Sequence, residues 1–70
     1  MKGAMSPQQL SLTIRRLRKR ANLTQKQLAD KAAVSQSYVS QLEKGRSEEP
    51  SVYVVQRIAK VLDVSIEELL

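Results

Sequence analysis

Cysteine, histidine, phenylalanine and tryptophan are all absent from this chain of 70 residues, which also has only two glycines, two prolines and two tyrosines. Without Cys or His, neither a disulfide nor a Cys- or His-based metal site can stabilise so small a domain. The apolar residues, 41% of the chain, must therefore form a core of Leu, Ile, Val and Ala side chains. This length allows one domain with one small core.

Long apolar runs and leader-like segments are missing as well. No stretch approaches the roughly 18 apolar residues that suggest a transmembrane helix, and the opening MKGAMSPQQL lacks the apolar region of a signal peptide. We therefore expect a cytoplasmic protein that does not act at a membrane. We also expect no enzyme, cofactor or metal, because there is no His or Cys, no clustered acid pair and no phosphate-binding glycine loop.

The charge that is present is unevenly distributed. Residues 1–46 contain ten Lys and Arg residues against Asp30 and Glu43, a net charge of +8, whereas residues 47–70 carry a net charge of −3. The whole chain has a net charge of +5 and a pI of about 10.0. A basic part joined to an acidic part favours a surface that attracts polyanions, although a merely basic domain has the same composition.

Capping residues and an apolar period of about 3.6 residues divide the chain into five short helices. Residues 1–5 have no pattern and are expected to be a disordered tail, and residues 6–70 are expected to form one all-α domain. The predicted helix starts are Ser6-Pro7, Thr24 with Gln27, Ser35, Pro50-Ser51, and Ser65 with Glu68. The predicted inward stripes are Leu10, Ile14, Leu17 and Ala21, then Leu28, Ala29 and Ala32, then Val52, Val55, Ile58, Ala59 and Leu62.

The second and third predicted helices are each under ten residues long. Joined by a turn of about four residues, they cannot pack antiparallel and are expected to cross steeply as a helix-turn-helix. Val34 fits the turn, Val39 and Leu42 face inward, and Gly45 is expected to end the third helix, which spans about residues 35–44. The outward edge of that helix carries neutral hydrogen-bonding groups: Gln36, Ser37, Ser40 and Gln41.

These residues carry a family resemblance. LTQKQLADKAAVSQSYVSQLEKG, followed by PS and IAKVLDVSIEELL, resembles the DNA-binding domain of the phage-repressor/Cro-like (Xre) helix-turn-helix family over about residues 14–70. The resemblance implies a five-helix lambda-repressor-like domain that binds double-stranded DNA and regulates transcription, most often as a repressor. One departure is Ala33, where the motif commonly has Gly, because a left-handed backbone there would cost Ala about 1 kcal/mol or more.

The resemblance also assigns roles to residues. The third helix would lie in the major groove, with Gln36, Ser37, Ser40 and Gln41 on base edges, since Gln can pair bidentately with adenine. Phosphate contacts are expected from Gln25 at the second helix start, where the dipole favours anions, and from Lys44 and Arg46. Capping by Gln25, solvated charges at Lys44 and Arg46, and ordinary surface polarity of the third helix remain the alternatives. Tyr38 either packs against the first two helices or directs its hydroxyl to a phosphate.

Two further sets of residues are predicted to act in the fold and in dimer formation, respectively. Arg18 and Glu43 are expected, by the resemblance, to form a structural ion pair. Helix four has more apolar surface than a small core needs, so Val54, Val61 and Leu69 are predicted to form a homodimer contact suited to a palindromic operator. The alternative to a DNA-binding regulator is an antitoxin or protein-interaction module with the same fold, in which a protein partner is primary and DNA binding is secondary.

Overall fold

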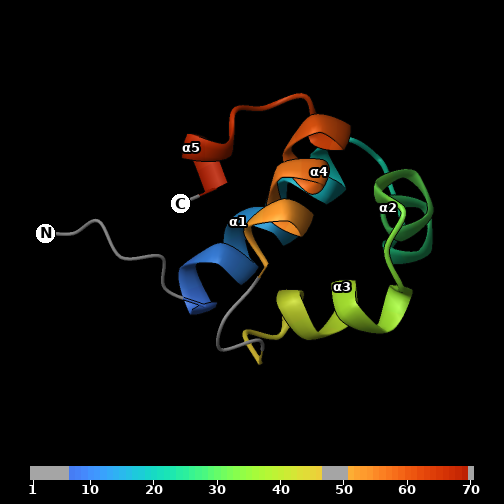
Figure 1. Ribbon diagram of the computed structural model, residues 1–70, viewed down its shortest axis with the longest axis horizontal. Helices are drawn as coiled ribbons and strands as arrows, with labels where there is room; N and C mark the ends of the chain where they lie inside the picture. The colour runs from blue at the N-terminus through green and yellow to red at the C-terminus, as the bar shows by residue number, and fades with distance from the viewer. Residues whose placement is uncertain (1–6, 47–50, 70) are drawn as a thin grey trace, which may run out of the picture.

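The computed structural model describes residues 7–46 and 51–69, and these residues form five helices and no strand. The helices are α1 (Pro7–Arg20), α2 (Gln25–Ala32), α3 (Gln36–Glu43), α4 (Val52–Leu62) and α5 (Ile66–Leu69). Figure 1 shows them folded around one centre, with α3 along one side and α5 at the opposite side. The all-α five-helix fold is therefore confirmed. The expected cap Ser6, the expected tail at residues 1–5, Pro50 and Leu70 lie outside the described residues.

The predicted start signals act as caps. At α2, the Thr24 hydroxyl accepts from the Gln27 N–H at 3.0 Å and the Gln27 Oε1 accepts from the Thr24 N–H at 2.8 Å, a complete capping box. The Ser35 hydroxyl accepts from the Tyr38 N–H at 3.1 Å, and the Ser51 hydroxyl accepts from the Val54 N–H at 3.4 Å. Each hydroxyl satisfies a helical N–H that has no partner within its helix, and Gln27 satisfies the N–H of the cap residue Thr24.

The ends of α2 and α3 differ in their chemistry. Gly45, at φ 71°, closes α3 with bonds from its own N–H to the Leu42 oxygen at 3.1 Å and from the Arg46 N–H to the Gln41 oxygen at 3.0 Å. After α2, the left-handed position is taken by Ala33 at φ 60° and ψ 43°. The departure noted in the sequence is thus a residue with a Cβ in a conformation that favours glycine.

The core draws side chains from all five helices. Its buried members are Leu10, Ile14, Leu17, Leu28, Ala29, Ala32, Val39, Leu42, Val55, Ile58, Ala59, Leu62 and Leu69. Each large aliphatic side chain removed from water contributes on the order of 1.5–3 kcal/mol before the entropy cost of ordering it. This one core fixes the angle at which α2 and α3 meet.

Three expectations about the apolar residues were wrong, and all three concern helix ends. Ala21 is exposed because α1 ends at Arg20 and the chain turns away through Asn22 at φ 60°. Val52 is 55% exposed because it opens α4, one turn before the part of that helix that the core covers. Leu69 is 1% exposed, since α5 packs on both α1 and α4 and its leucine closes the core. Leu69 is therefore not available as a dimer contact.

Candidate nucleic-acid interface

The helix-turn-helix geometry arises from tight packing at the α2–α3 corner. α3 lies at a steep angle to α2 (Figure 1). In the turn, the half-buried Val34 donates its N–H to the Ala29 oxygen at 2.9 Å. Val39 and Leu42, 0% and 2% exposed, fasten the inner face of α3. The outer face of α3 is therefore held in a fixed orientation.

One open groove collects nearly all the residues predicted to contact DNA. Its lining is Gln25, Gln36, Ser37, Ser40, Gln41, Lys44 and Arg46. Gln36, Ser37, Gln41, Lys44 and Arg46 are exposed, and Gln25 and Ser40 are partly buried. Among the described residues that line it, the groove thus has a neutral hydrogen-bonding wall, two cations at one end and no acid. A duplex backbone with exposed base edges fits such a surface better than a small apolar ligand does.

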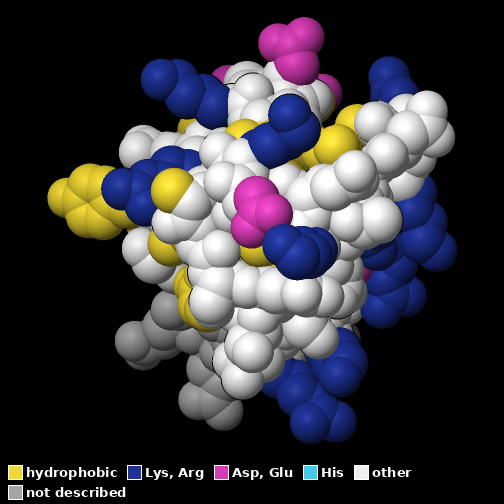
Figure 2. Space-filling model, turned by 90° about the vertical axis from the view of Figure 1, so that its right-hand side faces the viewer, with side chains coloured by type: hydrophobic (Ala, Val, Ile, Leu, Met, Phe, Trp, Pro, Cys, Tyr) yellow, Lys and Arg dark blue, Asp and Glu magenta, His cyan; other side chains and the backbone are white. Residues whose placement is uncertain are grey.

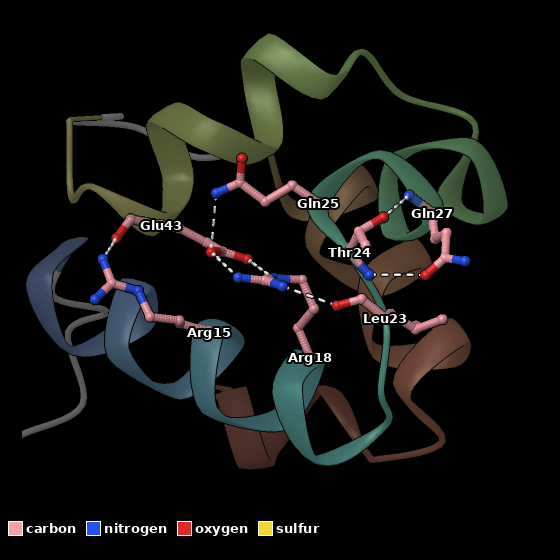
Figure 3. A network of polar contacts seen from close by, with 7 residues as sticks. All are labelled: Arg15, Arg18, Leu23, Thr24, Gln25, Gln27 and Glu43. Atoms are coloured by element: carbon pink, nitrogen blue, oxygen red, sulfur yellow. Dashed lines mark hydrogen bonds and ion pairs between the residues drawn. The ribbon is translucent and has the colours of Figure 1, made fainter.

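Glu43 anchors the last turn of α3, as Figure 3 shows. Its carboxylate accepts from Arg18 Nε at 2.6 Å and from Arg18 Nη2 at 2.9 Å, so the ion pair between these residues is bidentate. The Glu43 side chain is 1% exposed and that of Arg18 is 12% exposed. Hydrogen bonding to Glu43 raises the pKa of Arg18, against the opposing effect of burial and with added support from charge attraction.

Arg15 is a second anchor of α3 that the sequence reasoning missed. Its Nη2 donates to the backbone oxygen of Glu43 at 3.0 Å. A cation suits this position because the carbonyls at a helix C-terminus carry partial negative charge. The available signal was the spacing of Arg15 three residues before Arg18, which places both on the same side of α1.

Gln25 has a structural partner in addition to its place in the groove. Its Nε2 donates to Glu43 Oε1 at 3.1 Å. In Figure 3 the amide nitrogen points to Glu43 while the amide oxygen is turned toward α3. A carbonyl oxygen cannot donate to a phosphate, so the groups left for an anion are the second N–H of this amide and the free backbone N–H groups of the first turn.

The position of Tyr38 answers part of the question left open by the sequence. The ring is half-buried and packs against the core, and its hydroxyl oxygen accepts from the Ser51 N–H at 3.1 Å. The partner is the N-cap of α4, which neither sequence alternative named. A phenol can donate while it accepts, so its proton is still available to another oxygen.

α4 also carries an exposed aromatic residue that the sequence reasoning missed. Val54 and Val61 are half-buried beside the core, whereas Tyr53 is 77% exposed. Tyr53 lines a second hollow with Gln56, Arg57, Ala59, Lys60, Val64 and Ile66. On the face drawn in Figure 2, many Lys and Arg side chains lie along the right-hand side, and others lie beside the hydrophobic group that projects at the left. Within residues 7–46 and 51–69, no helix has the length and apolarity to span a membrane.

Comparison with known proteins identifies the family of this fold. The profile of the helix-turn-helix family HTH_3 matches residues 14–69. The transcriptional regulator SinR of Bacillus subtilis is 37% identical over 57 residues, which cover 81% of this chain and 51% of SinR. The chain thus spans about half the length of this curated relative.

Two solved structures have the same arrangement of helices. SinR in complex with DNA superposes with a TM-score of 0.82 at 33% identity, covering 86% of this chain and 95% of that one. SinR in a complex with the SinI protein superposes with a TM-score of 0.85 at 34% identity, covering 87% of this chain and 59% of that one.

Proposed function

The chain belongs to the HTH_3 helix-turn-helix family, and we propose that it is a sequence-specific double-stranded DNA-binding regulator of transcription, acting as a repressor. The observation that carries this proposal is the groove over α3. Neutral donors and acceptors line its wall, and Lys44 and Arg46 stand at its end. The DNA complex of SinR, a relative with the same fold, adds support.

In this proposal the exposed edge of α3 reads bases. Gln36 and Gln41 present carboxamides that can pair bidentately with adenine, and Ser37 and Ser40 can donate or accept. Short neutral side chains also avoid the cost of pressing an unpaired charge against base edges. Arg15 and Arg18, which hold Glu43, do not line the groove, so docking on DNA does not require their bonds to break.

The charged end of the groove would bind the phosphate backbone. Lys44 and Arg46 are exposed and follow directly on α3, where they can hold the domain in register without reading sequence. Gln25 would add the remaining N–H of its amide and the N-terminal N–H groups of α2. Tyr38 would donate its hydroxyl proton to a phosphate while it accepts from Ser51.

We further propose that two copies bind a palindromic operator through the surface of α4. This surface includes Val54 and Val61, together with the exposed Tyr53 in place of the buried Leu69. Arg57 and Lys60 on α4 and Glu67 and Glu68 on α5 offer opposite charges. A two-fold axis would place the Lys and Arg side chains of each copy opposite the Glu side chains of the other copy.

A second candidate function is a protein-interaction module, such as an antitoxin, with DNA binding secondary. The exposed Tyr53 favours it, because a partner protein could cover the same apolar surface. The SinR–SinI complex shows that a protein of this fold occurs in complex with another protein.

The test is selection from a library of random duplexes, followed by binding measurements on the enriched sequence. The proposal expects one enriched motif with two inverted half-sites about one helical turn apart. Gln36→Ala should change the preferred bases, at a cost of about 1–3 kcal/mol on the original site. Absence of any enriched motif, combined with a stoichiometric protein partner, would favour the second candidate.

A further inference from the structure

Tyr38 joins two helices that otherwise have little direct contact. α3 packs mainly on α1 and α2, while α4 packs mainly on α2 and α5. The hydroxyl of Tyr38, from the first turns of α3, accepts from the Ser51 N–H at 3.1 Å, and Ser51 is the N-cap of α4. This bond lies in a partly buried setting, where water competes with it less than at an open surface.

The bond acts at the end of α3 that lacks the other polar anchors. Glu43, with Arg18, Arg15 and Gln25, holds the C-terminal turn. The first turn carries Gln36 and Ser37 into the groove and is held by the Ser35 cap, a bond local to α3. Among the bonds described here, the Tyr38–Ser51 bond ties this first turn to a distant part of the fold.

We propose that Tyr38 is a positioning residue for base recognition, in which its hydroxyl, held by the Ser51 N–H, fixes the orientation of Gln36 and Ser37 in the DNA groove. This inference rests on the proposed function. It also links the groove to α4, the helix whose surface we propose as the dimer contact, through a single hydrogen bond.

Tyr38→Phe removes the hydroxyl and keeps the ring, and Lys31→Ala, at an exposed residue of α2 that does not line the groove, is the control. Affinity is measured by fluorescence anisotropy on the selected operator and on duplexes substituted at the bases that Gln36→Ala affects. Loss of one net hydrogen bond predicts that Tyr38→Phe lowers the discrimination between these duplexes by about 2- to 10-fold. Lys31→Ala should leave the discrimination unchanged.

The donor of the bond can be removed separately. Ser51 has φ −67°, which proline adopts, so Ser51→Pro deletes the N–H and keeps φ at position 51 in its present range. Ser51→Pro also loses the hydroxyl cap, and Ser51→Ala controls for that loss because it keeps the N–H. The discrimination should fall in Ser51→Pro relative to Ser51→Ala, and Tyr38→Phe should add no further loss in Ser51→Pro.

Several results would overturn this inference. Unchanged discrimination in Tyr38→Phe, whether or not its unfolding midpoint falls, would leave Tyr38 with a structural role alone. An equal loss of affinity on every duplex would leave the hydroxyl with the phosphate contact alone and no positioning role. Specific binding by the wild-type chain in either case would leave the proposed function standing, whereas no specific binding by the wild-type chain would overturn both.

Discussion

Arg18 donates two hydrogen bonds to the Glu43 carboxylate, from Nε to one oxygen at 2.6 Å and from Nη2 to the other at 2.9 Å. The pair connects the last turn of α1 to the last residue of α3, and the Glu43 side chain is 1% exposed. A buried carboxylate is tolerated only when it is paired and hydrogen-bonded. The pair thus fixes the C-terminal end of α3, the helix proposed to contact base edges. Loss of either partner should therefore disturb the position of that end.

Arg18→Met should destabilise the fold by about 3–5 kcal/mol, because it leaves the Glu43 charge buried without its counter-ion. The free energy of unfolding from urea denaturation measures this. The double variant Arg18→Met/Glu43→Leu should recover much of the loss, since no charge is then buried. Equal free energies of unfolding for the single variant and the wild type would show that the pair does not stabilise the fold.

The pH dependence of this ion pair follows from the raised pKa of Arg18. A folded-state pKa above the unfolded value contributes stability that is fully present below the unfolded value and is lost as pH rises through the folded one. For a guanidinium both values lie in strongly alkaline solution. The Arg18 contribution should therefore stay constant when stability is measured between about pH 6 and pH 9. A decline across that range in wild type that is absent in Arg18→Met would contradict this.

Ala33→Gly should stabilise the chain by up to about 1 kcal/mol, because Ala33 occupies the left-handed region at φ 60°. Part of the gain is offset by the greater freedom of glycine in the unfolded chain. Ala21→Gly is the matched control, as Ala21 is exposed and does not have a positive φ, and it should give no gain. Thermal unfolding of both variants provides the comparison.

Leu69 and Tyr53 should respond differently to substitution. Leu69→Ala removes a buried side chain and should cost about 2–5 kcal/mol. Tyr53→Glu alters an exposed residue and should keep the helical content while it lowers self-association and cooperative binding to a two-half-site operator. Circular dichroism and sedimentation on both variants check this. Unchanged assembly in Tyr53→Glu would remove α4 from the proposed dimer contact.

Lys44→Ala should weaken binding to all duplexes to a similar degree and reduce the salt slope by about 1. The reason is that a phosphate contact supplies affinity without sequence information. Lys31→Ala is a charge-matched control, because Lys31 is exposed on α2 and does not line the groove. A base-dependent effect of Lys44→Ala would instead place this side chain on a base edge.

Local signals in the sequence predicted the helices well. Thr24, Ser35, Gly45 and the apolar periods act within one or two turns, so their effect does not depend on the rest of the fold. The errors at Ala21, Val52 and Leu69 share a physical cause. Whether the end of an apolar stripe is covered depends on which other helix packs there, and a periodicity carries no information about that neighbour.

Contacts between residues far apart in the sequence were harder to predict from the sequence. The Arg18–Glu43 pair was expected from the family resemblance, whereas the bonds of Arg15 and Gln25 to Glu43 depend on how α1 and α2 approach the end of α3. The Tyr38–Ser51 bond spans helices separated by a loop, and a half-buried tyrosine gives no sequence signal for its hydrogen-bond partner. The neutral edge of α3 was visible in the sequence, but its convergence with Gln25, Lys44 and Arg46 in one groove was visible only in the structure.

The most direct test of the proposed DNA-binding function is the affinity of the chain for its selected duplex and for an unrelated duplex, each measured across a range of salt concentrations. The account predicts that log affinity falls linearly with log salt on both duplexes, because phosphate contacts release counter-ions. It also predicts a preference for the selected duplex that Gln36→Ala reduces. Affinity that does not change with salt, or equal affinity for both duplexes under all conditions, would contradict the account.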